Sequence, residues 1–137
     1  MKVLTIGTFD LLHLGHINFL HRCAELGYLV VGVNTDEFVT TFKERPILDF
    51  HERLSGIESL GYVATRNDSP GRKLIEKVDP DFLIVGSDWA RKDYYTQIDM
   101  TQDLFDKLDI GVIYLPRTTG LMPPMSSTEI KRRIREN

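Results

Sequence analysis

Four short apolar runs divide this chain, and they constrain its fold more than any other feature. They occupy residues 3–6, 29–33, 82–85 and 112–115, and each is nearly continuous rather than alternating. Such runs are typical of strands in a parallel sheet that is buried on both faces. A weaker run at residues 62–65 predicts a fifth strand.

Helical patterns lie between these runs. Apolar spacing predicts a helix over 16–24, ended by Gly27, and another over 51–60, ended by Gly61. Further helices are expected at 70–78, with Pro70 near the first turn, at 101–108 and at 126–136. This alternation predicts an α/β fold: a Rossmann-like, doubly wound, five-stranded and mostly parallel sheet with helices on both faces. We expect residues 1–137 to form a single domain.

Charge and cysteine content narrow the function. Lys plus Arg number 17 and Asp plus Glu number 20, so the net charge is 17 − 20 = −3. A chain of this charge is not expected to bind nucleic acid nonspecifically, because such binding needs a basic surface. One cysteine excludes an internal disulfide and fits a reducing compartment. With no signal-peptide pattern and no apolar run of membrane length, we expect a cytoplasmic protein that does not bind membranes.

The segment 7–16, GTFDLLHLGH, lies between the first strand and the first helix. A strand, a glycine-marked turn and a helix start form an anion site, because the first helical N–H groups have no partners within the helix. His13 and His16 flank Gly15, which has no Cβ and lets a ligand approach the backbone. We interpret this segment as a site for a chain of phosphates.

Two other interpretations of the histidines remain open. His13 and His16 are three residues apart, so both could bind zinc, but His21, Cys23 and His51 show no ligand spacing to complete such a site. They could also be ordinary surface histidines. We favour phosphate contact over both.

Polar side chains follow other strands as well, where the carboxyl ends of parallel strands meet at one edge of the sheet. They occupy residues 34–36, 86–89 and 117–120. Arg117 offers a planar fork of donors suited to phosphate, although a loop arginine can also pair with a surface carboxylate. Ser126 and Glu129 fit a helix-capping box, and Ser127 and Thr128 add hydroxyls at that helix start.

Several remaining residues have both a functional and an ordinary interpretation. Lys43 and Arg45 lie in a polar loop that could fold over a ligand or stay solvated. Arg53 lies near the start of a predicted helix and could either contact a ligand or have an ordinary structural role. Asp88 and Trp89 could read a nucleotide base by hydrogen bonding and stacking, or Trp89 could belong to the core.

These motifs resemble the nucleotidyltransferase superfamily with the H-x-G-H motif, and within it the cytidylyltransferases that act on glycerol 3-phosphate. The resemblance lies in 7–16, in 35–38 (TDEF), in 86–89 (GSDW) and in Arg117-Thr118-x-Gly120 followed by 126–128 (SST). It implies a catalytic set and a nucleotide-binding set. The catalytic set is His13, His16, Lys43 and Arg117; the nucleotide-binding set is Gly7, Thr8, Phe9, Gly15, Asp88, Trp89, Thr118, Ser126, Ser127 and Thr128. We assign Asp10, Arg45 and Arg53 to the second substrate.

The resemblance implies an enzyme that transfers CMP from CTP to a small phosphorylated alcohol and releases pyrophosphate. Glycerol 3-phosphate is the leading acceptor, Mg²⁺ is expected with the triphosphate, and a homodimer is expected. An adenylyltransferase that uses ATP is the nearest alternative. A nucleotide-binding module without turnover is another, raised by the four residues 121–124 that separate the last two motifs.

Overall fold

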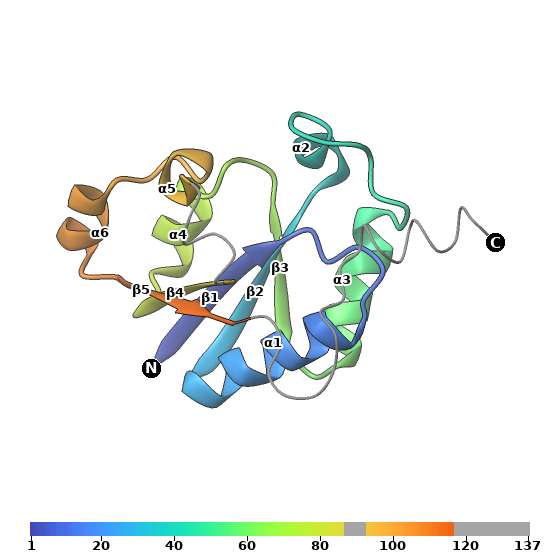
Figure 1. The fold of residues 1–137 in the computed structure, drawn as a ribbon, viewed down its shortest axis with the longest axis horizontal. Coiled ribbons are helices and arrows are strands. Elements are labelled where there is room, and N and C mark those ends of the chain that lie inside the picture. Colours follow the sequence, from blue (N-terminus) through green and yellow to red (C-terminus); the bar gives the residue numbers. More distant parts are fainter. Residues whose placement is uncertain (87–92, 117–137) are drawn as a thin grey trace.

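The computed structural model describes residues 1–86 and 93–116. Five strands form one sheet in the order β3-β2-β1-β4-β5, and every pairing is parallel. The strands are β1 (Lys2–Gly7), β2 (Tyr28–Asn34), β3 (Val63–Asn67), β4 (Phe82–Gly86) and β5 (Gly111–Leu115), as Figure 1 shows. Each predicted apolar run overlaps one strand, so the predicted α/β, Rossmann-like architecture is confirmed.

Six helices connect or follow these strands in the described residues. They are α1 (Leu14–Leu26), α2 (Asp36–Val39), α3 (Phe50–Ser59), α4 (Arg72–Val78), α5 (Tyr94–Gln97) and α6 (Gln102–Leu108). The two short helices, α2 and α5, were not predicted, and the helix predicted at 126–136 lies outside the described residues. Among the described helices, none is long and apolar enough to cross a membrane.

Helix boundaries follow from local side-chain chemistry. At α3, the Asp49 carboxylate accepts from Glu52 N and the Glu52 carboxylate accepts from Asp49 N, which satisfies two of the N–H groups at the helix start. At α4, the cap is Gly71 with φ of 149°, so the helix begins at Arg72. The helix predicted at 70–78 therefore starts two residues later than expected, and Pro70 lies near its first turn, directly before the cap.

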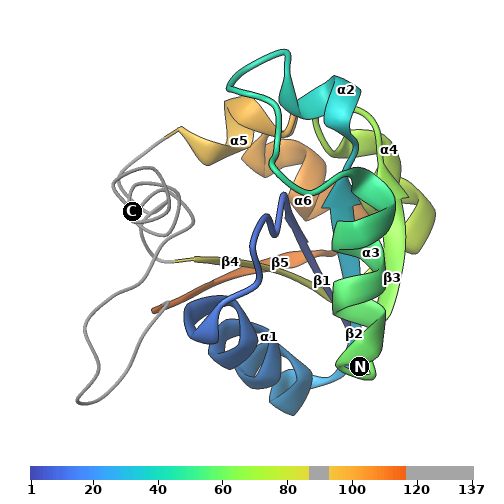
Figure 2. The same ribbon diagram turned by 90° about the vertical axis from the view of Figure 1, so that its right-hand side faces the viewer.

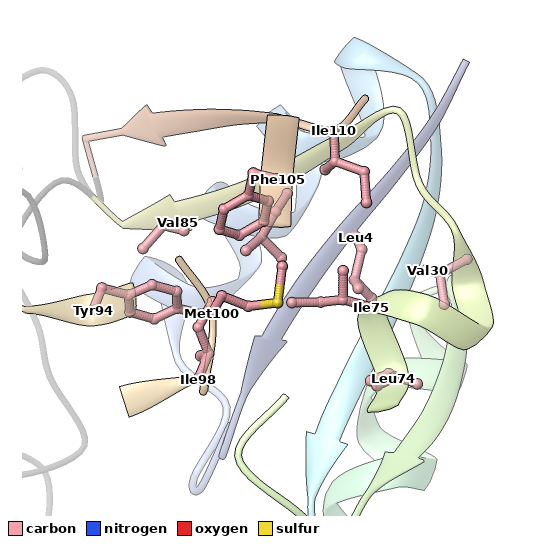
Figure 3. Close-up of a cluster of buried hydrophobic side chains, with 11 residues drawn as sticks. Leu4, Val30, Leu74, Ile75, Val85, Tyr94, Ile98, Met100, Phe105 and Ile110 are labelled. Atoms are coloured by element: carbon pink, nitrogen blue, oxygen red, sulfur yellow. The ribbon is translucent and has the colours of Figure 1, made fainter. Parts of the chain in front are cut away.

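Helices cover both faces of the sheet, as predicted. Figure 2 shows α1 below the sheet and α5 and α6 above it. Successive strand residues pack into cores on opposite faces of the sheet. Leu83 and Val85 pack on the face covered by α4, α5 and α6, whereas Ile84 packs on the face covered by α1 and α3. Figure 3 shows the first of these cores, in which α5 contributes Tyr94 and α6 contributes Phe105. Two packed cores fix the sheet between its helices and leave its carboxyl edge to the connecting loops.

Candidate active site

Both histidines of the H-x-G-H segment lie at the start of α1, His16 in its first turn and His13 just before it. His13 is the N-cap, and its Nδ1 accepts a hydrogen bond of 3.0 Å from Gly15 N. An accepting Nδ1 carries no proton, so the neutral ring bears its proton on Nε2. His13 thus satisfies one of the N–H groups at the helix start and presents Nε2 as a donor.

His13 and His16 lie face to face. Their ring centroids are 3.9 Å apart and the rings are inclined by 23°. The Phe9 ring meets His16 edge-on at 5.7 Å. Phe9 and Leu11 both have φ of 54°, a backbone conformation that is costly for residues with a side chain. The loop between β1 and α1 is therefore held in a strained shape that brings these rings together.

A pocket opens between the carboxyl ends of β1 and β4 and the start of α1. Its empty space is about 600 Å³, a figure that includes open solvent at the mouth. Six predicted site residues line it: Gly7, Thr8, Phe9, His13, Gly15 and His16. The structure brings this part of the predicted set together at one cavity.

Tyr94 also lines this pocket, and sequence reasoning did not include it in the site. It reaches the cavity from α5, beyond the end of β4, and is 6% exposed. Burial, with a smaller contribution from Tyr114, raises the pKa of the Tyr94 phenol, so its hydroxyl keeps its proton over the physiological range. Asp93 caps the short helix α5 that carries Tyr94, and such a cap does not by itself indicate a binding site.

Asp10 is placed differently from the substrate-binding role that we predicted. One carboxylate oxygen accepts from Ile47 N at 2.8 Å and the other accepts from Leu48 N at 3.0 Å. The side chain is 3% exposed and is not among the pocket-lining residues. Asp10 therefore fastens the loop that carries Lys43 to the loop that carries the histidines.

The Arg53 side chain likewise points into the interior of the protein and is fully buried. Its Nη1 donates to Thr8 O at 2.7 Å, its Nε donates to Leu48 O at 3.0 Å, and its Nη2 pairs with Asp36 Oδ1 at 2.7 Å. In this structure the guanidinium supports the backbone of both loops. A direct contact between Arg53 and substrate finds no support in this position.

The two cations of the loop after α2 lie outside the pocket lining. Lys43 Nζ lies 5.8 Å from the centroid of the Phe42 ring. Arg45 Nη2 lies 3.7 Å from Asp36 Oδ2, and its side chain is 73% exposed. That Lys43 reaches a phosphate and Arg45 a substrate stays a prediction.

The rest of the predicted site lies outside the described residues. These positions are Asp88, Trp89, Arg117, Thr118, Ser126, Ser127 and Thr128. The zinc alternative gains no support from the part of the chain that is described, because no group of three or more His, Cys, Asp or Glu there could hold a metal ion.

Known proteins match this chain over most of its length. Residues 4–133 match the family model described as cytidylyltransferase-like. The glycerol-3-phosphate cytidylyltransferases of Staphylococcus aureus and Bacillus subtilis are each 36% identical to 97% of this chain, covering 94% and 96% of those proteins. A crystal structure titled lipopolysaccharide core biosynthesis protein, from Thermoplasma volcanium, superposes with a TM-score of 0.70 at 31% identity and covers 88% of this chain and 98% of that one.

Proposed function

Because this chain belongs to the cytidylyltransferase-like family of nucleotidyltransferase enzymes, we propose that it transfers CMP from CTP to glycerol 3-phosphate. The products are CDP-glycerol and pyrophosphate. The observation that carries the proposal is the His13–His16 pair, which stacks at the start of α1 and lines the pocket. Relatives matched over nearly the whole length of this chain bear the name of that activity.

The chemistry requires little from the protein beyond positioning and charge stabilisation. A phosphate oxygen of glycerol 3-phosphate attacks the α-phosphorus of CTP and forms a new P–O bond. The bond from the α-phosphorus to the bridging oxygen breaks, and pyrophosphate leaves with the electron pair. The nucleophile is already anionic at neutral pH, so no strong general base is needed.

The described residues supply donors for the charge that develops. The proposed donors to the α-phosphate are His13 Nε2, His16 and the N–H groups at the start of α1, because donors that are in place beforehand stabilise a transition state more than a ground state. From the family resemblance we extend this proposal to Lys43, Arg117, Thr118 and 126–128 as contacts of the triphosphate. Asp88 and Trp89 are proposed contacts of the base.

Magnesium enters the proposal as part of the substrate. The described pocket lining contains hydroxyls, imidazoles and backbone groups but no carboxylate. This donor set does not suit a resident magnesium ion, which prefers carboxylate and phosphate oxygens. We therefore propose that Mg²⁺ arrives bound to the triphosphate and that phosphate and water oxygens provide most of its ligands.

The homodimer is proposed from the resemblance as well. Size-exclusion chromatography coupled to light scattering would give a mass about twice 15.8 kDa for a dimer. A mass near 15.8 kDa at assay concentration would reject the dimer and leave the proposed chemistry intact.

Pyrophosphate release tests the activity directly. The assay pairs CTP or ATP with a panel of phosphorylated alcohols in the presence of Mg²⁺. We expect release with CTP and glycerol 3-phosphate and little with ATP. Turnover with ATP alone would identify an adenylyltransferase. Binding of CTP without turnover for any acceptor of the panel would contradict the proposed transfer.

A further inference from the structure

Three polar side chains form a continuous row along the carboxyl edge of the sheet. Asn67 ends β3, Asn34 ends β2 in register with it, and Thr8 follows β1. Asn67 and Asn34 are 2% and 7% exposed, whereas Thr8 lines the pocket. Buried amides must be hydrogen-bonded to be tolerated, so the direction of each bond in the row is informative.

The row has a fixed direction because it begins at a backbone carbonyl. Asn67 Nδ2 donates to Ser69 O at 2.8 Å and to Asn34 Oδ1 at 2.8 Å. A carbonyl can only accept, so the amide of Asn67 cannot be turned round without losing the bond to Ser69. With its oxygen engaged by Asn67, Asn34 points its nitrogen at Thr8.

The Thr8 hydroxyl is consequently the acceptor at the end of the row. Asn34 Nδ2 lies 3.5 Å from Thr8 Oγ1, a long hydrogen bond. The hydroxyl hydrogen of Thr8 takes no part in this contact and stays available as a donor. The backbone of Thr8 is held independently, because Arg53 Nη1 donates to Thr8 O at 2.7 Å.

We propose that Asn67 and Asn34 are positioning residues that hold the Thr8 hydroxyl as a donor to a phosphate oxygen of the bound nucleotide. The proposal rests on the proposed function, since it needs a nucleotide in this pocket. It adds a donor to the face that already carries the histidines and the start of α1. Residues at the ends of three strands therefore determine the direction in which the Thr8 hydroxyl donates its hydrogen.

Replacing Asn34 by aspartate reverses the last bond with little change of shape. The carboxylate that N34D introduces still accepts from Asn67, but it can only accept from Thr8, so the Thr8 hydrogen turns away from the pocket. The test is a double-mutant cycle of Thr8→Val and Asn34→Asp, with the Kd for CTP measured by calorimetry at about pH 8, where a carboxylate is ionised. In the wild-type background we expect Thr8→Val to weaken CTP binding on the order of tenfold.

In the Asn34→Asp background we expect Thr8→Val to change the Kd by less than about twofold, because the hydroxyl no longer serves the ligand. Thr8→Ser keeps the hydroxyl and should stay within about twofold of the wild type. If Asn34→Asp unfolds the protein, Asn34→Ala replaces it, and Thr8→Val should then cost about threefold because the hydroxyl can rotate. The same loss from Thr8→Val in both backgrounds would overturn the proposal.

Thr65→Val on β3 is the matched control, since it removes a hydroxyl from the same sheet outside the row and should leave the Kd unchanged. The experiment distinguishes an error in the proposed positioning role from an error in the proposed function. An additive cycle with normal turnover rejects only the positioning role. A coupled cycle with no pyrophosphate release supports the positioning role and rejects the transfer.

Discussion

Arg53 and Asp36 form an ion pair of 2.7 Å in which the arginine side chain is fully buried. The same guanidinium donates to carbonyls of both loops that surround the candidate site. A buried charge is tolerated only when its donors are satisfied. Here the partners come from three separate segments, so the pair joins α3 to the loops that carry the histidines and Lys43.

Replacing Arg53 should therefore unfold the site region rather than merely weaken catalysis. We expect Arg53→Met to lower the free energy of unfolding by about 3–5 kcal/mol, because it removes the short ion pair with Asp36 Oδ1 and the donors to two partly buried carbonyls. Urea denaturation followed by circular dichroism measures this. Arg45→Met is the matched control: Arg45 lies 3.7 Å from the same carboxylate but is exposed, so its loss should cost no more than about 1 kcal/mol. Equal losses for the two variants would contradict the assigned role of Arg53.

His16 carries the most direct prediction for catalysis. We expect His16→Ala to lower kcat for pyrophosphate release by about 10²–10³-fold, because it removes a donor aimed at developing charge. The melting temperature should change little. His21→Ala is the control on the same helix; His21 is exposed and lies 3.7 Å from Glu25, away from the pocket. Turnover of His16→Ala near that of His21→Ala would reject a catalytic role for His16.

Asp10 should govern how tightly the loop that carries Lys43 is held. In Asp10→Asn one carboxylate oxygen becomes an amide nitrogen, so either Ile47 N or Leu48 N loses its acceptor, at a cost of about 1–3 kcal/mol. We expect faster hydrogen exchange at both backbone amides, measured by NMR under native conditions. Asp68→Asn, which alters an exposed pair with Arg66, should leave these rates unchanged. Unchanged exchange in Asp10→Asn would show that the loop is held by other contacts.

The contrast between these residues shows what the sequence could predict. The strands and the histidine segment are local patterns that can be recognised in the sequence. The rule that ligands bind at the carboxyl ends of parallel strands then predicts that the histidine segment lies beside a ligand pocket. Asp10 contacts backbone groups 37 and 38 positions away, and Arg53 contacts the carbonyl of Thr8, 45 positions away. No local pattern reveals which distant backbone groups a charge will meet. The short helices α2 and α5, of four residues each, are below the length at which periodicity is informative.

Cys23 provides a prediction for stability at alkaline pH. Burial among the apolar residues of α1 and the sheet raises the pKa of its thiol from 9.0 to about 12, with a smaller opposing effect from Arg22. Above about pH 9 the unfolded chain therefore loses a proton that the folded protein keeps. The stabilisation is fully present below about pH 9 and declines as the pH rises towards 12, by about 1.4 kcal/mol per pH unit.

The measurement is urea unfolding of the wild type and of Cys23→Ala at about pH 8 and about pH 10. Cys23→Ala should be less stable at pH 8, because it leaves a cavity in the core. Between the two pH values, however, the wild type should lose about 1.4 kcal/mol more than the variant, since only the wild type has a thiol to ionise on unfolding. The buried Tyr94 phenol is common to both proteins, so its titration cancels in the difference. Parallel losses would mean that the thiol ionises equally in the folded and unfolded states, and that water reaches Cys23 in the native protein.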